Sequence, residues 1–162
     1  LHGLSLKYIL LTHGHYDHIS GVPELLEACG TLPELYMSHT DLSLRPVFAG
    51  DSIQLDPAQV KDWADGDTVS LDSITFRVLS TPGHTPGSVC LIAGDVIFSG
   101  DTLFQGSCGR TDFPGGSWTQ MEQSLRRLYE LPGDYTVLSG HTGSTTLERE
   151  RRTNMFMRSA IS

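Results

Sequence analysis

Six consecutive residues, His13 to His18, read His-Gly-His-Tyr-Asp-His and directly follow a short apolar run. His13 and His15 are two positions apart, so both side chains leave an extended strand end on one side and can chelate a single cation. Asp17 and His18 follow where the chain must turn, and they place a second donor pair beside the first. Imidazole nitrogen with carboxylate oxygen suits Zn²⁺, Fe²⁺ or Mn²⁺ better than Ca²⁺ or Mg²⁺. This segment predicts a metal site.

Three later segments share one layout, in which a short apolar strand and a turn lead to a residue that can bind metal. A glycine immediately precedes that residue each time, and it lets the backbone turn sharply so that the next side chain points off the strand end. The three residues are His84, Asp101 and His141. Together with the first segment they indicate one metal centre. His2 and His39 lack this layout, and we interpret both as ordinary residues.

The elements that must position these residues alternate between strands and helices. Strands are expected over residues 7–11, 35–38, 68–71, 74–79, 89–92, 96–99 and 135–139. Turns are expected at 65–67 and 72–73, and the residues 93–95 join two strands into a hairpin.

Helices are expected over residues 23–28, 40–45 and 145–158, and residues 47–61 have no clear period and predict a long connection. Ser117 and Gln120 form a capping box that begins a further helix, which ends before Pro132-Gly133. Its apolar stripe at helical spacing predicts core packing for Trp118, Met121, Leu125 and Leu128. The interleaved elements indicate an α/β chain with mixed sheets.

Size and composition limit the class of protein. A chain of 162 residues has room for one domain with a substantial core. The net charge of −8 argues against nucleic acid and against an anionic membrane surface as partners. Three cysteines without CxxC spacing argue against a disulfide framework and favour a reducing cytoplasm. No apolar run approaches the length of a membrane span. The oligomeric state is left open.

Four motifs resemble those of the metallo-β-lactamase superfamily, and within it those of the glyoxalase II group, the hydroxyacylglutathione hydrolases. They are Thr12–His18, Pro82–Thr85, Ser99–Thr102 and Ser139–His141, in the order of the family. The resemblance runs from about Leu6 to Asn154. It implies an αββα sandwich with a dinuclear metal site at one edge.

Carried onto this sequence, the resemblance implies a ligand set for each of two metals. Metal 1 is held by His13, His15 and His84, and metal 2 is held by Asp17, His18 and His141. Asp101 bridges the two metals. The metals are two divalent ions, with zinc favoured and iron or manganese as alternatives.

Two further segments narrow the resemblance. Residues 100–104 with 108–113 resemble the small single-domain glyoxalase II-like hydrolases, and they also resemble the persulfide dioxygenases. The ending over residues 140–146 and 148–154 favours the hydrolases. Arg110 stands where large glyoxalases II place a lysine, so whether the substrate derives from glutathione stays open.

The start of the chain departs from the family pattern. Family members begin with several strands before the first histidine motif, which arrives here at residue 13. We therefore expect residues 1–162 to form a single domain that lacks its first N-terminal strands, which leaves a sheet edge unpaired. Either an upstream segment is missing through truncation, which the absence of an initial Met favours, or another chain covers this edge.

The activity that the resemblance implies is hydrolysis of a small-molecule thioester, such as S-lactoylglutathione, by a hydroxide that bridges the metals. Asp17 and Asp101 are the expected catalytic residues, with Asp17 orienting the hydroxide. Arg110 either anchors a substrate carboxylate or forms an ion pair at the surface. The alternative is a mononuclear iron persulfide dioxygenase that uses His13, His84 and Asp101. A third possibility is a truncated chain that binds metal without activity.

Overall fold

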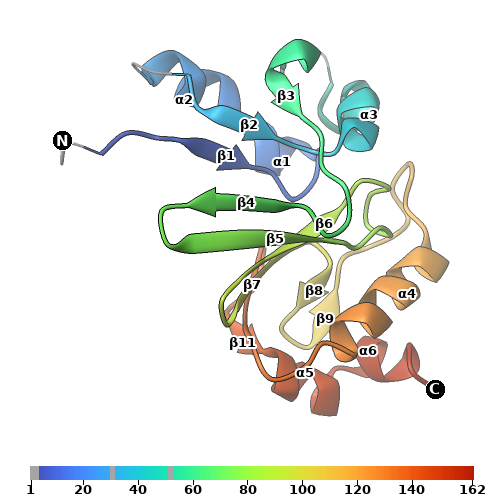
Figure 1. The fold of residues 1–162 in the computed structure, drawn as a ribbon. Coiled ribbons are helices and arrows are strands. Elements are labelled where there is room, and N and C mark those ends of the chain that lie inside the picture. The colour runs from blue at the N-terminus through green and yellow to red at the C-terminus, as the bar shows by residue number, and fades with distance from the viewer. Residues whose placement is uncertain (1–3, 30–31, 51–52) are drawn as a thin grey trace.

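A computed structural model describes residues 4–29, 32–50 and 53–162 of the chain. The interpretation of His2 lies outside these residues. Within them, the two larger sheets lie between two groups of helices (Figure 1). Three apolar clusters fill the spaces between these four layers. The expected αββα sandwich is confirmed, whereas the expectation that N-terminal strands are missing stays a prediction.

The smaller sheet contains three parallel strands in the order β1 (Tyr8–Leu10), β2 (Glu34–Tyr36) and β3 (Val60–Lys61). Parallel neighbours need crossover connections. The connection from β1 to β2 contains α1 (Tyr16–Ile19) and α2 (Val22–Ala28), and the one from β2 to β3 contains α3 (His39–Ala49). The cluster between this sheet and its helices includes Ile9, Ile19, Leu35, Leu42 and Val60.

The larger sheet contains six strands in the order β11-β10-β7-β6-β5-β4. Their bounds are β4 Thr68–Leu71, β5 Ile74–Ser80, β6 Val89–Ala93, β7 Val96–Gly100, β10 Thr136–Ser139 and β11 Thr145–Thr146. β10 pairs with β7 in parallel, and the other pairs are antiparallel. The expected mixed sheet and its hairpins are confirmed. A short hairpin of β8 (Leu103–Phe104) and β9 (Ser107–Cys108) follows β7.

Helix α4 (Trp118–Tyr129) covers the outer face of the larger sheet (Figure 1). Its expected N-cap is confirmed, since the Ser117 hydroxyl accepts a hydrogen bond from the backbone N–H of Gln120. Met121, Leu125 and Leu128 are fully buried as expected. The core assignment of Trp118 is wrong, because its side chain is 40% exposed and meets the Phe156 ring edge-on.

Two expectations about the N-terminal half need correction. The expected helix 40–45 begins one residue earlier and continues to Ala49, through Pro46. The expected strand 35–38 ends at Tyr36, because Ser38 leaves the strand to cap α3 and accepts a hydrogen bond from Thr40 N. The segment 47–61 is therefore no plain connection, since it contains the end of α3, the 3₁₀ turn Pro57–Gln59 and strand β3.

The expected helix over residues 145–158 is also wrong as one element. Thr145 and Thr146 pair with β10 as β11, and the helix is divided into α5 (Leu147–Thr153) and α6 (Met155–Ser159). Asn154 causes the division. It adopts an extended backbone conformation, and its side chain accepts hydrogen bonds from Phe156 N and Met157 N as the N-cap of α6. In the described part of the chain, no helix has the length and apolar character to cross a membrane.

Candidate metal centre

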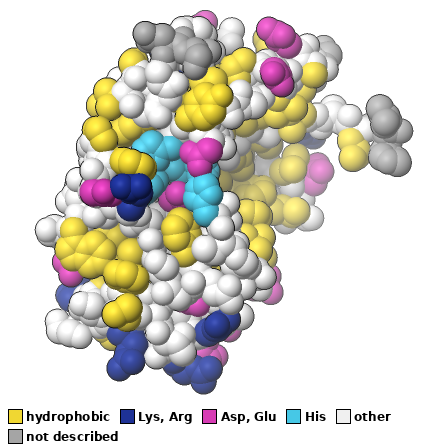
Figure 2. All heavy atoms as spheres, turned by 180° about the vertical axis from the view of Figure 1, so that it is seen from behind, with side chains coloured by type: hydrophobic (Ala, Val, Ile, Leu, Met, Phe, Trp, Pro, Cys, Tyr) yellow, Lys and Arg dark blue, Asp and Glu magenta, His cyan; other side chains and the backbone are white. Residues whose placement is uncertain are grey.

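The predicted donors follow the ends of strands from both sheets. His13 and His15 come after β1, and Asp17 and His18 lie in α1. The other three donors follow β5, β7 and β10, and they are His84, Asp101 and His141. The structure brings all seven together. Figure 2 shows histidine and acidic side chains gathered on one face of the molecule, next to hydrophobic side chains.

The first donor group consists of His13, His15 and His84. One ring nitrogen of each lies within 4.8 Å of the others. His15 Nδ1 is 2.8 Å from His84 Nε2, and the His13 ring centroid lies 5.0 Å from that of His15 and 4.9 Å from that of His84. This is the set that the resemblance implies for metal 1.

The second donor group consists of Asp17, His18 and His141. His141 Nε2 lies 3.0 Å from Asp17 Oδ2 and 3.3 Å from His18 Nε2. Asp17 and His141 are about half exposed, so this group faces the solvent more than the first group does. It matches the set implied for metal 2.

Asp101 lies between the two donor groups. Its Oδ2 is 3.4 Å from His84 Nε2 in the first group and 3.2 Å from His141 Nε2 in the second. Its Oδ1 is 3.4 Å from His18 Nε2. The carboxylate therefore reaches both groups, which is the placement that a bridging ligand requires.

Two buried donor atoms show that this cluster fits a bound metal. His13 Nε2 and Asp101 Oδ1 are buried without a hydrogen-bond partner in the described part of the chain. A buried polar atom without a partner costs about 1–3 kcal/mol, so the protein gains if another group satisfies it. A divalent cation does this with the donor types found here, and the remaining nitrogens and oxygens of the cluster point at the same space.

The protonation states also favour metal binding. Burial, and then the neighbouring His84, lower the pKa of His15 to about 4, and burial lowers the pKa of His13 further. Burial by itself raises the pKa of Asp101, but the neighbouring imidazoles of His18, His84 and His141 outweigh burial, and the net pKa is lowered. Neutral imidazoles and an ionised carboxylate at neutral pH are the forms that bind a cation.

His18 differs from the buried imidazoles. Burial lowers its pKa, but the neighbouring carboxylates of Asp101 and Asp17 outweigh burial and raise it. Without metal, His18 therefore attracts a proton between two carboxylates, and a bound cation would take the place of that proton.

Backbone and side-chain partners orient the imidazoles of the first group. His84 Nδ1 lies 2.7 Å from the Arg110 carbonyl oxygen, to which it donates as an N–H. His13 Nδ1 lies 3.2 Å from the Thr12 hydroxyl. In both residues the other ring nitrogen, Nε2, is left to face the centre. Such partners fix the tautomer and the ring orientation of a metal ligand.

Glycines place two of the donors, as expected from the sequence. Gly83 and Gly100 have positive φ angles of 143° and 49°, which side chains rarely adopt. A Cβ atom at Gly83 would also lie 2.5 Å from the backbone nitrogen of Met121. The turns before His84 and Asp101 therefore require glycine.

A cavity of about 510 Å³ adjoins the donor cluster. Four aromatic side chains line it, and they are Tyr16, Phe48, Phe104 and Phe113. Sequence reasoning missed Phe48, because its segment was interpreted as a connection, whereas helix α3 turns it toward His15, with ring centroids 4.8 Å apart. Cys108 also lines the cavity, and burial raises the pKa of its thiol to about 11, so the thiol is neutral.

Arg110 lines the same cavity but has a partner of its own. Its Nε and Nη2 each donate to an oxygen of Asp112 at 2.6 Å, and the guanidinium lies 3.9 Å from the centre of the Phe113 ring. The ion pair that the sequence left open is thus formed. A role in anchoring a substrate carboxylate stays a prediction.

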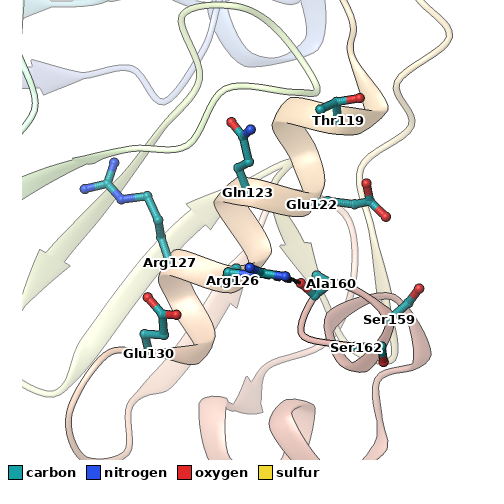
Figure 3. A pocket seen from close by; sticks show the side chains of 9 residues that line it. All are labelled: Thr119, Glu122, Gln123, Arg126, Arg127, Glu130, Ser159, Ala160 and Ser162. Carbon is teal, nitrogen blue, oxygen red and sulfur yellow. Dashed lines mark hydrogen bonds between the residues drawn. The ribbon is translucent and has the colours of Figure 1, made fainter.

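A second hollow of about 540 Å³ lies between α4 and the C-terminal residues (Figure 3). Arg126 donates from Nε and Nη2 to the Ala160 carbonyl, and Arg127 is paired with Asp65. The residues that line this hollow include no histidine or cysteine. This hollow therefore lacks the imidazole donors found at the metal centre. His39 also stays outside the donor groups, and its Nε2 lies 2.8 Å from the Val60 carbonyl.

Known proteins resemble this chain in sequence and in fold. A family model described as the metallo-beta-lactamase superfamily matches residues 1–141. The hydroxyacylglutathione hydrolase GloC of Haemophilus influenzae is 35% identical over an alignment of 171 residues. The alignment covers 96% of this chain and 78% of that protein.

Two solved structures are similar along nearly the whole chain. TTHA1623 in a di-iron-bound form has a TM-score of 0.81 and 40% identity, covering 95% of this chain and 79% of that one. ETHE1 from Myxococcus xanthus has a TM-score of 0.76 and 30% identity, covering 99% of this chain and 70% of that one.

Proposed function

This chain belongs to the metallo-beta-lactamase superfamily, and we propose that it is a dinuclear metal-dependent hydrolase of small-molecule thioesters. The position of Asp101 carries the proposal, because its carboxylate lies within 3.4 Å of nitrogen atoms in both donor groups. The relative named hydroxyacylglutathione hydrolase supports the thioester substrate. The structure of a relative in a di-iron-bound form supports a site for two metals.

The proposal assigns three donors to each metal and shares a seventh donor between the two. His13, His15 and His84 would hold metal 1, and Asp17, His18 and His141 would hold metal 2, with Asp101 as the shared ligand. Zinc is our first choice, and iron or manganese is compatible with the same donors. When bound, two such cations supply a hydroxide nucleophile near neutral pH and polarise the substrate carbonyl.

The other side chains of the cavity bind and orient the substrate. Asp17 lines the cavity and is about half exposed. Its carboxylate can accept a hydrogen bond from the attacking nucleophile and so orient it. Tyr16, Phe48 and Phe113 form an apolar wall for the acyl or thiol group. Arg110 is proposed to contact a substrate carboxylate, which would compete with Asp112 for the guanidinium. S-lactoylglutathione is the first substrate to test.

A second candidate is a mononuclear iron persulfide dioxygenase. His84 Nε2 lies 3.4 Å from Asp101 Oδ2, and the His13 ring adjoins that of His84, so these three residues can form a set of two imidazoles and one carboxylate. The similarity to ETHE1 of Myxococcus xanthus supports this candidate. The extra donors Asp17, His18 and His141, already grouped, favour the dinuclear proposal.

Metal content distinguishes the candidates. The protein should be analysed for the number and identity of bound metals, and assayed for hydrolysis of S-lactoylglutathione and of one thioester without glutathione. Two metals per chain with hydrolysis support the proposal. One iron per chain, with oxygen consumption on a persulfide, supports the dioxygenase instead. A chain that binds metal and performs neither reaction would contradict both. A cytoplasmic location, and the absence of nucleic acid and membrane partners, stay predictions.

A further inference from the structure

We infer that Asp41 is a positioning residue that fixes the relative position of the two loops that carry the metal 1 ligands. The inference rests on the ligand assignment of the proposed function. Asp41 lies in the first turn of α3 and is fully buried. It has no place in the donor clusters, and the sequence patterns did not single it out.

The Asp41 carboxylate accepts three hydrogen bonds, from two loops that are far apart in the sequence. Its Oδ2 accepts from the backbone N–H of Gly14 at 2.9 Å and from the Thr85 hydroxyl at 2.6 Å. Its Oδ1 accepts from the backbone N–H of Gly87 at 2.7 Å. These donors are neutral groups, and burying a carboxylate among them is costly unless all of them are in place.

Two of the three donors stand directly beside ligands of metal 1, and the third, Gly87, lies three residues after His84. Gly14 separates His13 from His15, and Thr85 follows His84. One carboxylate therefore connects the loop that follows β1 to the loop that follows β5. The ligands that these two loops carry also meet, since His15 Nδ1 lies 2.8 Å from His84 Nε2.

The glycines on these loops show that the backbone is shaped to receive Asp41. A Cβ atom at Gly87 would lie 2.6 Å from Asp41 Oδ1 and 2.4 Å from the Ser38 hydroxyl. A Cβ atom at Gly14 would lie 3.2 Å from that of Asp41. Any side chain at Gly87 would thus take the space of the carboxylate. Partners that hold metal ligands in place typically change metal affinity by about 10–100-fold when they are removed.

The test measures how an Asp41 substitution changes zinc affinity in two variant proteins, each of which keeps only one complete donor group. His141→Ala keeps all of the first group, and His84→Ala keeps all of the second. Asp41→Asn replaces one acceptor oxygen by an N–H donor, which must face a donor from one of the two loops. We expect it to lower zinc affinity about 10–100-fold in the His141→Ala background. In the His84→Ala background the change should stay within about twofold, as for independent sites.

Zinc affinity is measured by competition with a chromophoric chelator, and the visible spectrum of the cobalt form reports ligand geometry directly. The spectrum of the His141→Ala protein should change on adding Asp41→Asn. Equal weakening in both backgrounds, or no weakening in either, would overturn the inference. If His141→Ala alone binds no zinc, the ligand assignment itself is wrong and the inference falls with it.

Glu150 is a matched control for the loss of a buried carboxylate. It is also fully buried and accepts three hydrogen bonds, from Thr145, Gly106 and Asn154, none of which adjoins a metal 1 ligand. Glu150→Gln should leave zinc affinity in the His141→Ala background within about twofold. If it weakens zinc binding as much as Asp41→Asn does, general loosening of the fold explains both results and the inference is wrong.

A second pair of variants covers the case in which Asp41→Asn fails to fold. Thr85→Val removes one of the three donors to Asp41, and Thr85→Ser keeps it. In the His141→Ala background, the valine variant should bind zinc more weakly than the serine variant. Equal affinities for the two would contradict the inference.

Discussion

Gly140 packs so closely on Asp101 that a Cβ atom at position 140 would lie 2.4 Å from Asp101 Oδ1. The same Cβ atom would lie 2.7 Å from Cε1 of the His18 ring. The backbone N–H of Gly140 also donates to the Gly100 carbonyl at 2.9 Å, which joins the ends of β10 and β7. Position 140, directly before His141, therefore requires glycine, because a side chain there would collide with Asp101, the proposed shared ligand.

Gly140→Ala should push Asp101 and His18 apart and disturb both metal sites. We expect metal affinity and thioester turnover to fall by at least about 10-fold, the lower end of the range for groups that hold ligands in place. Gly143→Ala is the control, because a Cβ atom there meets only the flexible end of Gln105, at 3.2 Å. Competition with a chelator measures the affinity. Equal affinities for the two variants would contradict this account of Gly140.

Asp101→Ala should be the most damaging single change at the centre. Asp101 is the residue that reaches both donor groups, so its loss would leave two cations facing each other in a partly desolvated pocket without a shared anion. We expect the second metal to be lost and turnover to fall by more than about 100-fold, beyond the range for residues that only position ligands. Elemental analysis gives the metal content. A variant with two metals and near-normal turnover would disprove the bridging role.

His84→Ala and His141→Ala should have unequal effects. His84 is almost fully buried in the first group, whereas His141 is about half exposed in the second. We expect His84→Ala to abolish hydrolysis, and His141→Ala to lower metal content and rate while the chain stays folded. Circular dichroism checks folding, and turnover is measured at saturating zinc. Two tightly bound metals and full activity in His141→Ala would show that the metal 2 assignment is wrong.

The metal-free protein should lose stability as the pH falls from 6.5 to about 4. Burial, with help from His84, lowers the pKa of His15 from 6.5 to about 4, so over this window the unfolded chain binds a proton that the folded chain does not. The free energy of unfolding therefore decreases as pH decreases. His18 has the opposite sign, because the net effect of burial, Asp101 and Asp17 raises its pKa, and it offsets part of the loss.

Thermal unfolding of chelator-treated protein across this pH range tests that prediction. His15→Asn removes the titrating ring, so the decline of Tm toward low pH should become shallower than in the parent protein. Identical declines for the two proteins would contradict the assignment to His15.

Asn154→Ala should destabilise the fold without touching the metal ligands. Asn154 is fully buried, caps α6 and donates from Nδ2 to Glu150 and to the Ser107 carbonyl. Loss of the cap and of partners for buried acceptors should lower the free energy of unfolding by about 2–4 kcal/mol. Denaturant unfolding measures it. Thr153→Ala, at an exposed neighbour, should cost much less, and an equal cost would contradict the role of Asn154.

The sequence by itself determined the donor types and the strand ends that carry them. His13, His15, Asp17 and His18 lie within six residues, so local chain geometry alone keeps them near one another. The β4–β5 and β6–β7 hairpins were likewise predictable from the sequence. Their turns depend on a few adjacent residues, such as Gly94, which has a φ of 57°. Metal binding and the α/β class follow from such local patterns.

Only the tertiary structure decided how distant groups meet. Asp101 reaches both donor groups because β7 lies between β6 and β10 in the sheet, and no local pattern encodes that strand order. Asn154 divides the expected last helix because its side chain finds partners in the β8–β9 hairpin. Asp41 connects two loops that it meets only after α3 has packed. Such contacts form between residues far apart in sequence, so their energies depend on packing and burial rather than on the spacing of neighbouring residues.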